Sequence, residues 1–307
     1  MQQKHLVSLM DWSTGDIQEV LALTTRVKTR PDDFRTALLG KTLAMIFQKK
    51  STRTRVSFEV GMFQLGGHAL FLSGTDIQLG RGETIADTAR VLSRYVDIIM
   101  ARVYGQEDID NLAKWSSVPV INGLSDRFHP CQALTDYFTM QEVFGEDLRG
   151  KKLVYVGDGN NMAHSLLLCG VKLGVHVAIV SPEGYWPDVE IVKAAQAVDP
   201  KLVTVTHDPH DATKGADVIY TDVWASMGQE QEQKIREKAF AGYTVDDALF
   251  ANANENAVFM HCLPAHRGEE VSESVCDGPR SIIFQQAENR LHTQKALMML
   301  LSGWNGP

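Results

Sequence analysis

The chain is poor in cysteine and has no long apolar segment. Its 307 residues include four cysteines, and none of them forms a Cys-x-x-Cys pair, so the spacings of a disulfide framework or a zinc site are missing. No run of 18 apolar residues is present, which excludes a transmembrane helix. The first residues lack the apolar stretch of a signal peptide. We therefore expect a cytoplasmic protein without a structural metal or a membrane partner.

An excess of basic residues is also missing. Lysine and arginine number 30 against 38 aspartates and glutamates, a net charge of −8. This balance argues against nucleic acid or a membrane surface as partner, because both favour a basic face. The hydrophobic content of 44% and the charged content of 22% are typical of a soluble globular protein. A chain of this length suits two domains of ordinary size.

Apolar strand-like runs alternate with helical patterns in both halves of the chain, which predicts α/β architecture with parallel sheets and crossover helices. The first half is expected to contain strands 42–47, 68–72, 97–102 and 118–122 and helices 54–66, 84–95, 106–115 and 130–144. The second half is expected to contain strands 152–156, 175–180, 203–206, 217–221 and 257–262 and helices near 161–173 and 287–302. The polar segment 145–150 indicates a boundary between two doubly wound parallel-sheet domains.

Residues 51–55 read Ser-Thr-Arg-Thr-Arg and follow the first predicted strand. Val56, Val60 and Phe63 come next at spacings of 4 and 3, which places them on one face of a helix. The start of a helix offers backbone N–H groups and the positive end of its dipole, and two arginines add charge. An ordinary capped helix is the alternative, but capping needs only one hydroxyl. We therefore predict a site for a phosphate or a carboxylate.

Other polar residues also follow predicted strands, where ligands of doubly wound sheets bind. Arg102 ends the strand 97–102, and its place beside the anion site favours a functional role over a side chain that merely reaches solvent. His129 and Gln132 lie one helical turn apart. His129 either caps its helix or donates to a developing oxyanion, and the local sequence does not separate the two.

The second half offers an acid, a thiol and a two-glycine turn. Asp222 follows the strand 217–221 and either balances an amine or caps a helix. Cys262 closes the strand 257–262; a buried cysteine is usually inert packing, but a strand end favours a role. Gly157-Asp-Gly-Asn-Asn-Met162 has Met162 in place of the third glycine of a dinucleotide fingerprint. A nicotinamide-dependent dehydrogenase is therefore the lesser alternative, and Asn161 with its neighbour suits an α-amino acid head group.

Four motifs together resemble the signatures of the aspartate/ornithine carbamoyltransferase family. Ser51-Thr-Arg-Thr-Arg55 is similar to the family's carbamoyl phosphate loop, and His129-Pro-Cys-Gln132 to its His-Pro-x-Gln element. Asp222-Val-Trp-Ala-Ser-Met-Gly228 and His261-Cys-Leu-Pro264 are similar to the two signatures of its ornithine-type members. The motifs stand in the family's order, and the resemblance covers nearly the whole chain. Cys131 fills the variable position of His-Pro-x-Gln, so we assign it no chemistry.

The resemblance implies a carbamoyl phosphate-binding domain at 1–145, on which a C-terminal helix at 288–307 packs back, and a Rossmann-like ornithine-binding domain at 146–287. The active site would lie in the cleft between them and would need no cofactor and no metal. The residues implied for carbamoyl phosphate are Ser51, Thr52, Arg53, Thr54, Arg102, His129, Gln132, Cys262, Leu263 and Arg290, with Gln78 from a neighbouring subunit. Those implied for ornithine are Asn161, Asp222, Ser226 and Met227. Arg102, His129, Asp222 and Cys262 would be catalytic.

The implied reaction moves the carbamoyl group of carbamoyl phosphate to the δ-amine of L-ornithine, giving L-citrulline and phosphate, a step of arginine biosynthesis. The implied assembly is a homotrimer with shared active sites. Aspartate, putrescine and N-acetylornithine are the alternative acceptors. Aspartate would need extra cationic groups, and putrescine would leave the head-group site at Asn161 without a purpose. A non-catalytic phosphate-binding protein would not need Arg102, His129 and Cys262 together.

Overall fold

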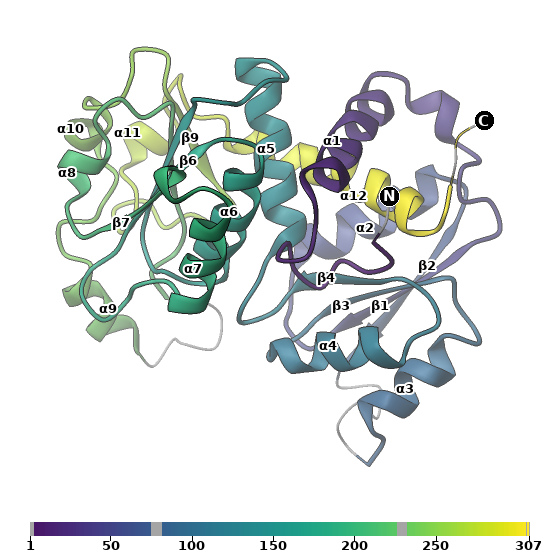
Figure 1. Cartoon of the computed structure of the whole chain (residues 1–307). Coiled ribbons are helices and arrows are strands. Elements are labelled where there is room, and N and C mark those ends of the chain that lie inside the picture. The colour runs from purple at the N-terminus through teal and green to yellow at the C-terminus, as the bar shows by residue number, and fades with distance from the viewer. Residues whose placement is uncertain (1–2, 75–81, 226–231, 305, 307) are drawn as a thin grey trace. The chain divides into compact units, whose positions relative to one another are not determined.

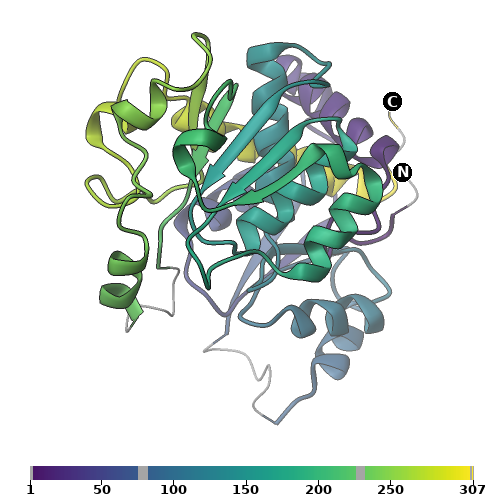
Figure 2. The same cartoon turned by 60° about the vertical axis from the view of Figure 1, so that its left-hand side comes forward.

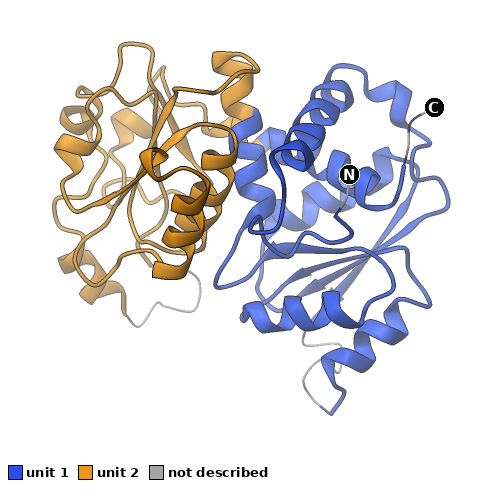
Figure 3. Ribbon diagram, in the orientation of Figure 1, with its two compact units in different colours: residues 1–138, 288–307 blue, residues 139–287 orange. Residues whose placement is uncertain are grey.

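The structure is a computed structural model that describes residues 3–74, 82–225, 232–304 and 306. The chain forms two compact units, which Figure 3 shows in different colours. Unit 1 consists of residues 1–138 and 288–307, and unit 2 of residues 139–287. Each unit has one wholly parallel sheet with helices on its faces, so the predicted pair of doubly wound α/β domains is confirmed.

Unit 1 has a four-stranded sheet in the order β2-β1-β3-β4. Its elements are α1 (Thr14–Thr29), the 3-10 helix η1 (Pro31–Phe34), β1 (Thr42–Phe47), α2 (Thr52–Gln64), β2 (His68–Ser73), α3 (Ile85–Leu92), β3 (Ile98–Arg102), α4 (Gln106–Trp115) and β4 (Val120–Leu124). Figure 1 shows α3 and α4 on one face of this sheet and α1 and α2 on the other. The nearly continuous apolar sequence of β1 is typical of a strand that is covered on both faces.

The core on the α3 and α4 side of unit 1 is built from short and branched side chains. Ile46 of β1, Ile99 of β3 and Val120 of β4 are fully buried there. Ile109 and Leu112 of α4 pack against them at helical spacing. The strands are therefore held in a fixed register, and their carboxyl ends form a defined edge.

The apolar face predicted for helix α2 is not its core face. Phe58 and Met62 are fully buried, whereas Val56, Val60 and Phe63 are 51%, 36% and 78% exposed. The apolar spacing correctly places the three exposed residues on one side of a helix, but burial is decided by what the sheet and the other helices cover. The exposed side chains form an apolar surface in unit 1.

Unit 2 has a five-stranded sheet in the order β7-β6-β5-β8-β9. Its elements are β5 (Lys152–Val156), α6 (Asn161–Lys172), β6 (His176–Val180), α7 (Val189–Val198), η2 (Pro200–Leu202), β7 (Val203–Thr206), α8 (Pro209–Ala212), β8 (Val218–Thr221), α9 (Gln233–Ala239), α10 (Asp247–Phe250), β9 (Val258–His261) and α11 (Glu273–Cys276). Figure 2 shows this sheet from a second side, with α6 and α7 along one face. The order places β5 in the centre, as in Rossmann-like sheets.

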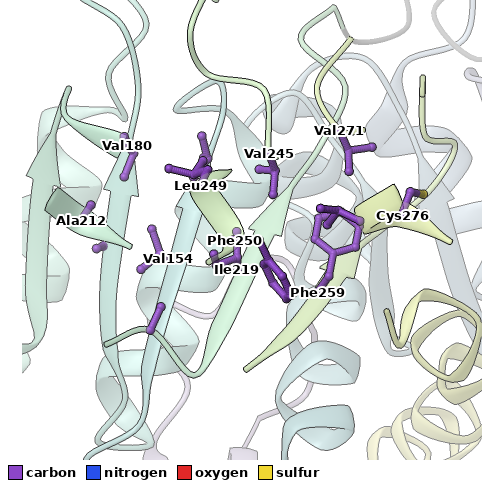
Figure 4. Close-up of a cluster of buried hydrophobic side chains, with 14 of the residues drawn as sticks. Val154, Val180, Ala212, Ile219, Val245, Leu249, Phe250, Phe259, Val271 and Cys276 are labelled. Carbon is purple, nitrogen blue, oxygen red and sulfur yellow. The ribbon is translucent and has the colours of Figure 1, made fainter. Parts of the chain in front are cut away.

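One of the hydrophobic clusters of unit 2 is drawn in Figure 4. Val154, Ile219 and Phe259 come from three neighbouring strands and are fully buried. Leu249 and Phe250 of α10 pack against them from the connection between β8 and β9. This core fixes the relative positions of the strand ends that carry Asp222 and Cys262.

Two long helices contain the points where the chain passes between the units. Helix α5 (Pro130–Phe144) includes the division after residue 138, and α12 (Ile283–Leu301) includes the division after residue 287. The polar segment 145–150, at which the sequence suggests a boundary, follows the end of α5. In unit 1, Lys28 Nζ donates to Asn289 Oδ1 at 2.7 Å and Lys295 Nζ to Gln64 Oε1 at 2.9 Å, so α12 is bonded to α1 and α2.

None of the helices within the described ranges is long and apolar enough to cross a membrane.

Candidate active site

The Ser-Thr-Arg-Thr segment of unit 1 lies at the carboxyl end of β1 and begins helix α2. Ser51 is the N-cap: its backbone is extended, and its hydroxyl accepts a hydrogen bond of 3.2 Å from the N–H of Thr54. This cap holds the first turn in a shape that directs its remaining N–H groups out of the helix end, as an anion site requires. Thr54 is buried and Arg53 is half-buried, so both lie within the site and not in solvent.

The second arginine of this segment has another role. Arg55 Nε pairs with Glu59 Oε2 at 3.3 Å along the helix. Its guanidinium carbon also lies 3.8 Å from the centre of the Phe71 ring. Arg55 thus has two partners of its own, Glu59 and Phe71, whereas Arg53 is the arginine of this segment whose charge acts on His129. We therefore keep Arg53 as the predicted arginine of the anion site.

Three arginines surround His129 inside unit 1. His129 precedes α5 and is 6% exposed, and Arg102, the last residue of β3, is also 6% exposed. Burial lowers the pKa of His129 well below 6.5, and the charges of Arg290, Arg102 and Arg53 lower it further. His129 is therefore neutral at physiological pH, with the guanidiniums from three different elements close to it. Arg102, His129 and Arg53, which lie at or after the ends of three different strands in the sequence, thus belong to one positively charged cluster, which we call the anion pocket.

Arg290 joins this pocket from helix α12. It is 4% exposed, and its Nη1 donates to Gln132 Oε1 at 2.6 Å. Gln132 Nε2 in turn donates to Asp136 Oδ1 at 2.8 Å, one turn further along α5. The predicted adjacency of His129 and Gln132 is confirmed, since α5 begins immediately after His129.

Cys131, between these residues, is inert. It is fully buried, and its Sγ donates to the carbonyl of Asn122 at 3.3 Å. Burial raises the pKa of its thiol to about 12. A thiol of such low acidity supplies no nucleophile, because the thiolate is the reactive form.

The acid and the thiol of unit 2 lie side by side. Strands β8 and β9 are parallel neighbours in which Thr221 pairs with His261, so the residues that follow them are adjacent. Cys262 Sγ donates to Asp222 Oδ1 at 3.0 Å, and the N–H of Val223 donates to the same oxygen at 2.8 Å. Asp222 is only 7% exposed. The interpretation of Asp222 as an ordinary helix cap is not supported: the residues described after it, 223–225, are not helical, and its carboxylate accepts from a thiol.

The backbone after Cys262 is fixed by a buried histidine. His261 Nδ1 accepts from the N–H of Leu263 at 2.8 Å, so the ring must carry its proton on Nε2, which lies 3.2 Å from Glu270 Oε1. His261 and Glu270 are buried. Leu263 has φ of 59°, a conformation in which its carbonyl and N–H are turned sharply from the strand direction.

The two-glycine turn after β5 is closed to a dinucleotide. A Cβ added at Gly159 would lie 2.2 Å from the backbone nitrogen of Pro187 and 2.4 Å from the carbonyl carbon of Trp186. The glycine is thus required by the chain segment that packs on it, and not by a pyrophosphate. Asn160 caps α6 by accepting from the N–H of Met162 at 2.9 Å, which leaves Asn161 at the first helical position.

Two groups of described side chains are close enough to share a metal ion. One is Asp222, His261 and Cys262, and the other is His266, Glu269 and Glu270. In the first group both ring nitrogens of His261 already take part in hydrogen bonds, to Leu263 and to Glu270. A metal there would have to replace these bonds, and we assign none.

Some implied residues fall outside the described ranges, and others were not found by local sequence reasoning. Gln78, Ser226 and Met227 belong to the segments 75–81 and 226–231, which the structure does not describe. Arg290 was indicated only by the family resemblance, because it follows no strand. Its signal is the run of buried polar side chains at helical spacing, to which Thr293 and Gln294 also belong.

Comparison with known proteins covers both units. Residues 4–142 match the family model for the aspartate/ornithine carbamoyltransferase carbamoyl-P binding domain. Residues 149–301 match the model for the Asp/Orn binding domain of the same family.

Similar proteins from several organisms match over almost their full length. An ornithine carbamoyltransferase of Anoxybacillus flavithermus is 55% identical over 306 residues, which cover 98% of this chain and 97% of that protein. The solved structure of the ornithine carbamoyltransferase from Pyrococcus furiosus has 55% identity and a TM-score of 0.93, with 97% of each chain covered. The structure from Thermus thermophilus has 42% identity and a TM-score of 0.89, with 98% of this chain and 99% of that one covered. The chain therefore belongs to the aspartate/ornithine carbamoyltransferase family.

Proposed function

We propose that this enzyme is an ornithine carbamoyltransferase, which converts carbamoyl phosphate and L-ornithine into L-citrulline and phosphate. The observation that carries the proposal is the set of three guanidiniums, from the start of α2, the end of β3 and helix α12, whose charges act on the neutral, buried His129. This pocket fits a dianionic phosphate that bears a reactive carbonyl. Arginine biosynthesis in the cytoplasm is the setting that we propose, and one similar protein, from Pyrococcus furiosus, is named as anabolic.

The proposed reaction begins with attack of the neutral δ-amine on the carbonyl carbon of carbamoyl phosphate. A C–N bond forms and the carbonyl oxygen becomes an oxyanion. The carbonyl then re-forms as the C–O bond to phosphate breaks, and the proton lost by the amine passes to the departing phosphate. Arg102, His129 and Thr54 would stabilise the oxyanion, a contribution worth about 10²–10³ in rate for one such donor. Arg53, Arg290 and Gln132 would hold the phosphate together with Ser51, Thr52 and the N–H groups of α2.

The proposed acceptor is ornithine because unit 2 offers a negative group where aspartate would need positive ones. Asp222 and Cys262 would contact the amine, with the Leu263 backbone near the carbonyl and Asn161 near the amino acid head group. Ser226 and Met227 are further proposed contacts. Putrescine lacks a head group, and N-acetylornithine carries an amide in place of the α-amine.

The decisive experiment is a citrulline assay with a panel of amine acceptors. Ornithine should exceed aspartate, putrescine and N-acetylornithine in kcat/KM by orders of magnitude, because a polar site rejects ligands that leave its groups unpaired. Asp222→Asn should reduce turnover of ornithine without improving turnover of aspartate. Comparable turnover of aspartate by the unaltered enzyme would refute the assignment. Titration with NAD(P)H, monitored by fluorescence, tests the dehydrogenase alternative.

We further propose a homotrimer in which each active site is completed by a neighbouring subunit. Support comes from the apolar α2–β2 surface, which we define as Val56, Val60, Phe63, Leu70 and Phe71; each of these side chains is at least 36% exposed. The groove over this surface is also lined by Ser51 and Thr52 of the anion site. A subunit seated in the groove would therefore lie next to the bound phosphate, where Gln78 of that subunit is proposed to act.

Mixed trimers test the shared site. Arg53→Ala and Gln78→Glu should each be nearly inactive alone. In a head-to-tail ring, a good site needs an intact Arg53 in one subunit and an intact Gln78 in the next. Equal mixing should therefore restore activity to about a quarter of the sites. Absence of recovery, with mixed trimers verified by mass spectrometry, would place Gln78 outside the neighbour's site.

A further inference from the structure

We infer that Gln294 is a positioning residue for the carbamoyl phosphate site, because it joins Arg290 to the helix that begins with the Ser-Thr-Arg-Thr segment. Gln294 is fully buried in α12, one turn after Arg290. Arg290 Nε donates to Gln294 Oε1 at 2.9 Å, and Gln294 Nε2 donates to Ser57 Oγ at 2.7 Å. Ser57 Oγ donates to the carbonyl of Arg53 at 2.6 Å.

The direction of every hydrogen bond in this series follows from the chemistry of the side chains. A guanidinium has donors only, so Gln294 must present its oxygen to Arg290. Its NH₂ group then faces Ser57 and must donate. The single hydroxyl proton of Ser57 is directed to the Arg53 carbonyl, which leaves a lone pair of Oγ to accept from Gln294. Only an amide satisfies both neighbours at position 294.

Close packing between the two helices supports the same function. Gly61 of α2 faces α12, and a Cβ added there would lie 3.2 Å from Lys295 Cγ and 3.3 Å from Met298 Cε. The missing side chain lets α12 approach α2 (Figure 1), so that Gln294 reaches Ser57. Arg290 is bonded on its other side to Gln132. Gln294 and Gln132 thus fix one guanidinium between α2 and α5.

This assignment rests on the proposed function and predicts which substrate a change at Gln294 affects. A misplaced Arg290 and a shifted first turn of α2 both weaken the binding of phosphate, whereas the acid–thiol pair of unit 2 is untouched. The KM for carbamoyl phosphate should therefore rise while the KM for ornithine, measured at saturating carbamoyl phosphate, stays within about twofold. A residue that only supports folding would change the active fraction and the Tm but leave both KM values unchanged.

The test uses two variants of Gln294 in the full-length enzyme. In Gln294→Glu the carboxylate still accepts from Arg290 but cannot donate to Ser57, and its charge offsets that of Arg290. We expect the KM for carbamoyl phosphate to rise about tenfold or more. In Gln294→Met the volume is kept, no charge is added and Arg290 loses its acceptor, so a rise of about threefold is expected. The matched control is Gln64→Glu, the same substitution at an exposed position of α2, where Lys295 can accept the new charge as a partner.

Thermal shift by inorganic phosphate gives a reading that does not depend on turnover. Phosphate should raise the Tm of the unaltered enzyme by mass action and raise that of Gln294→Glu less. If Gln294→Glu fails to fold, the neutral Gln294→Met must show the selective KM rise. A folded variant with an unchanged KM for carbamoyl phosphate would overturn the inference. An unaltered enzyme that forms no citrulline would instead refute the proposed function, which keeps the two failures distinct.

Discussion

The anion pocket of unit 1 and the acid–thiol pair of unit 2 occupy corresponding places, the carboxyl ends of parallel strands, but they are assembled differently. The pocket draws its charged groups from β3, α2 and α12 and its neutral histidine from the residue before α5, and these segments are far apart in the sequence. The pair in unit 2 comes from the ends of two strands that are direct neighbours. One site depends on the packing of several elements, whereas the other depends mainly on the register of a single strand pair.

The charges of the two sites are also opposite, and this difference separates the substrates. Three guanidiniums make unit 1 attractive to a phosphate dianion and lower the pKa of His129. In unit 2 the carboxylate of Asp222 is held by an N–H group and a thiol, with no guanidinium bonded to it in the described residues. The nearby Arg236 pairs with Asp158 at 2.6 Å instead. The strand ends determine where ligands bind, and the local charge determines which class of ligand binds.

The largest effect that we predict concerns the charge of the unit 1 pocket. Arg102→Ala should lower kcat about 10²–10³-fold, because a donor to the developing oxyanion is lost. The citrulline assay with saturating substrates measures this. Arg149→Ala is a suitable control, since its ion pair with Asp147 lies on the surface and should contribute little. If Arg102→Ala instead raised mainly the KM for ornithine, the assignment of the anion pocket to carbamoyl phosphate would be refuted.

The comparison also explains what could be predicted from the sequence. The ends of the strands can be predicted from the sequence, because buried parallel strands have nearly continuous apolar sequences. Arg102, Asp222 and Cys262 can therefore be placed at strand ends from local patterns alone. Arg290 and Gln294 could not, because their function depends on α12 meeting α2 and α5, a contact between distant segments. The exposed face of α2 was misjudged for a related reason: its spacing fixes which residues share a side but not what covers them.

The pH dependence of turnover distinguishes titration of His129 from titration of the δ-amine of ornithine. The attacking amine must be neutral, and a free amine of lysine type has a pKa of about 10.4. At low ornithine, kcat/KM should therefore rise nearly tenfold per pH unit, or up to about a hundredfold between pH 7 and pH 9. The pKa of His129 is lowered well below 6.5 by burial and then by its arginine neighbours, so it does not titrate in this range. His129→Gln should be slower but keep the same slope; a flattened profile would make His129 the titrating group.

A smaller effect is expected from the thiol of unit 2. Cys262→Ser shortens the side chain that bonds Asp222 and replaces a weak donor with a stronger one, which should hold the carboxylate away from the amine. The kcat/KM for ornithine should fall about tenfold, the size expected for a modest change of pocket shape. The affinity for carbamoyl phosphate should hardly change.

The control for general destabilisation is Cys276→Ser, which replaces a buried thiol in another part of unit 2. A selective loss of carbamoyl phosphate affinity would show that Cys262 has been given the wrong partner.

The smallest effect concerns stability in acid and compares a buried histidine of unit 1 with a partly exposed one of unit 2. The pKa of His129 is lowered by burial and by arginines, and that of His176 by partial burial and by Lys152. An unfolded histidine binds its proton near pH 6.5, so in both cases the unfolded chain gains protons first as the pH falls. The stability contributed by a neutral histidine is full above pH 6.5 and decreases below it. Each proton that the unfolded chain binds first can lower the free energy of unfolding by up to about 1.4 kcal/mol per pH unit, or the Tm by a few degrees.

Between pH 7 and pH 5, the Tm of His129→Gln should therefore fall less than the Tm of the unaltered enzyme. The fall in Tm of His176→Gln should be closer to that of the unaltered enzyme, because solvent reaches the His176 ring. The reverse order would mean that burial and the arginines of the anion pocket do not keep His129 neutral. The proposed electrostatic difference between the two units would then be refuted for His129.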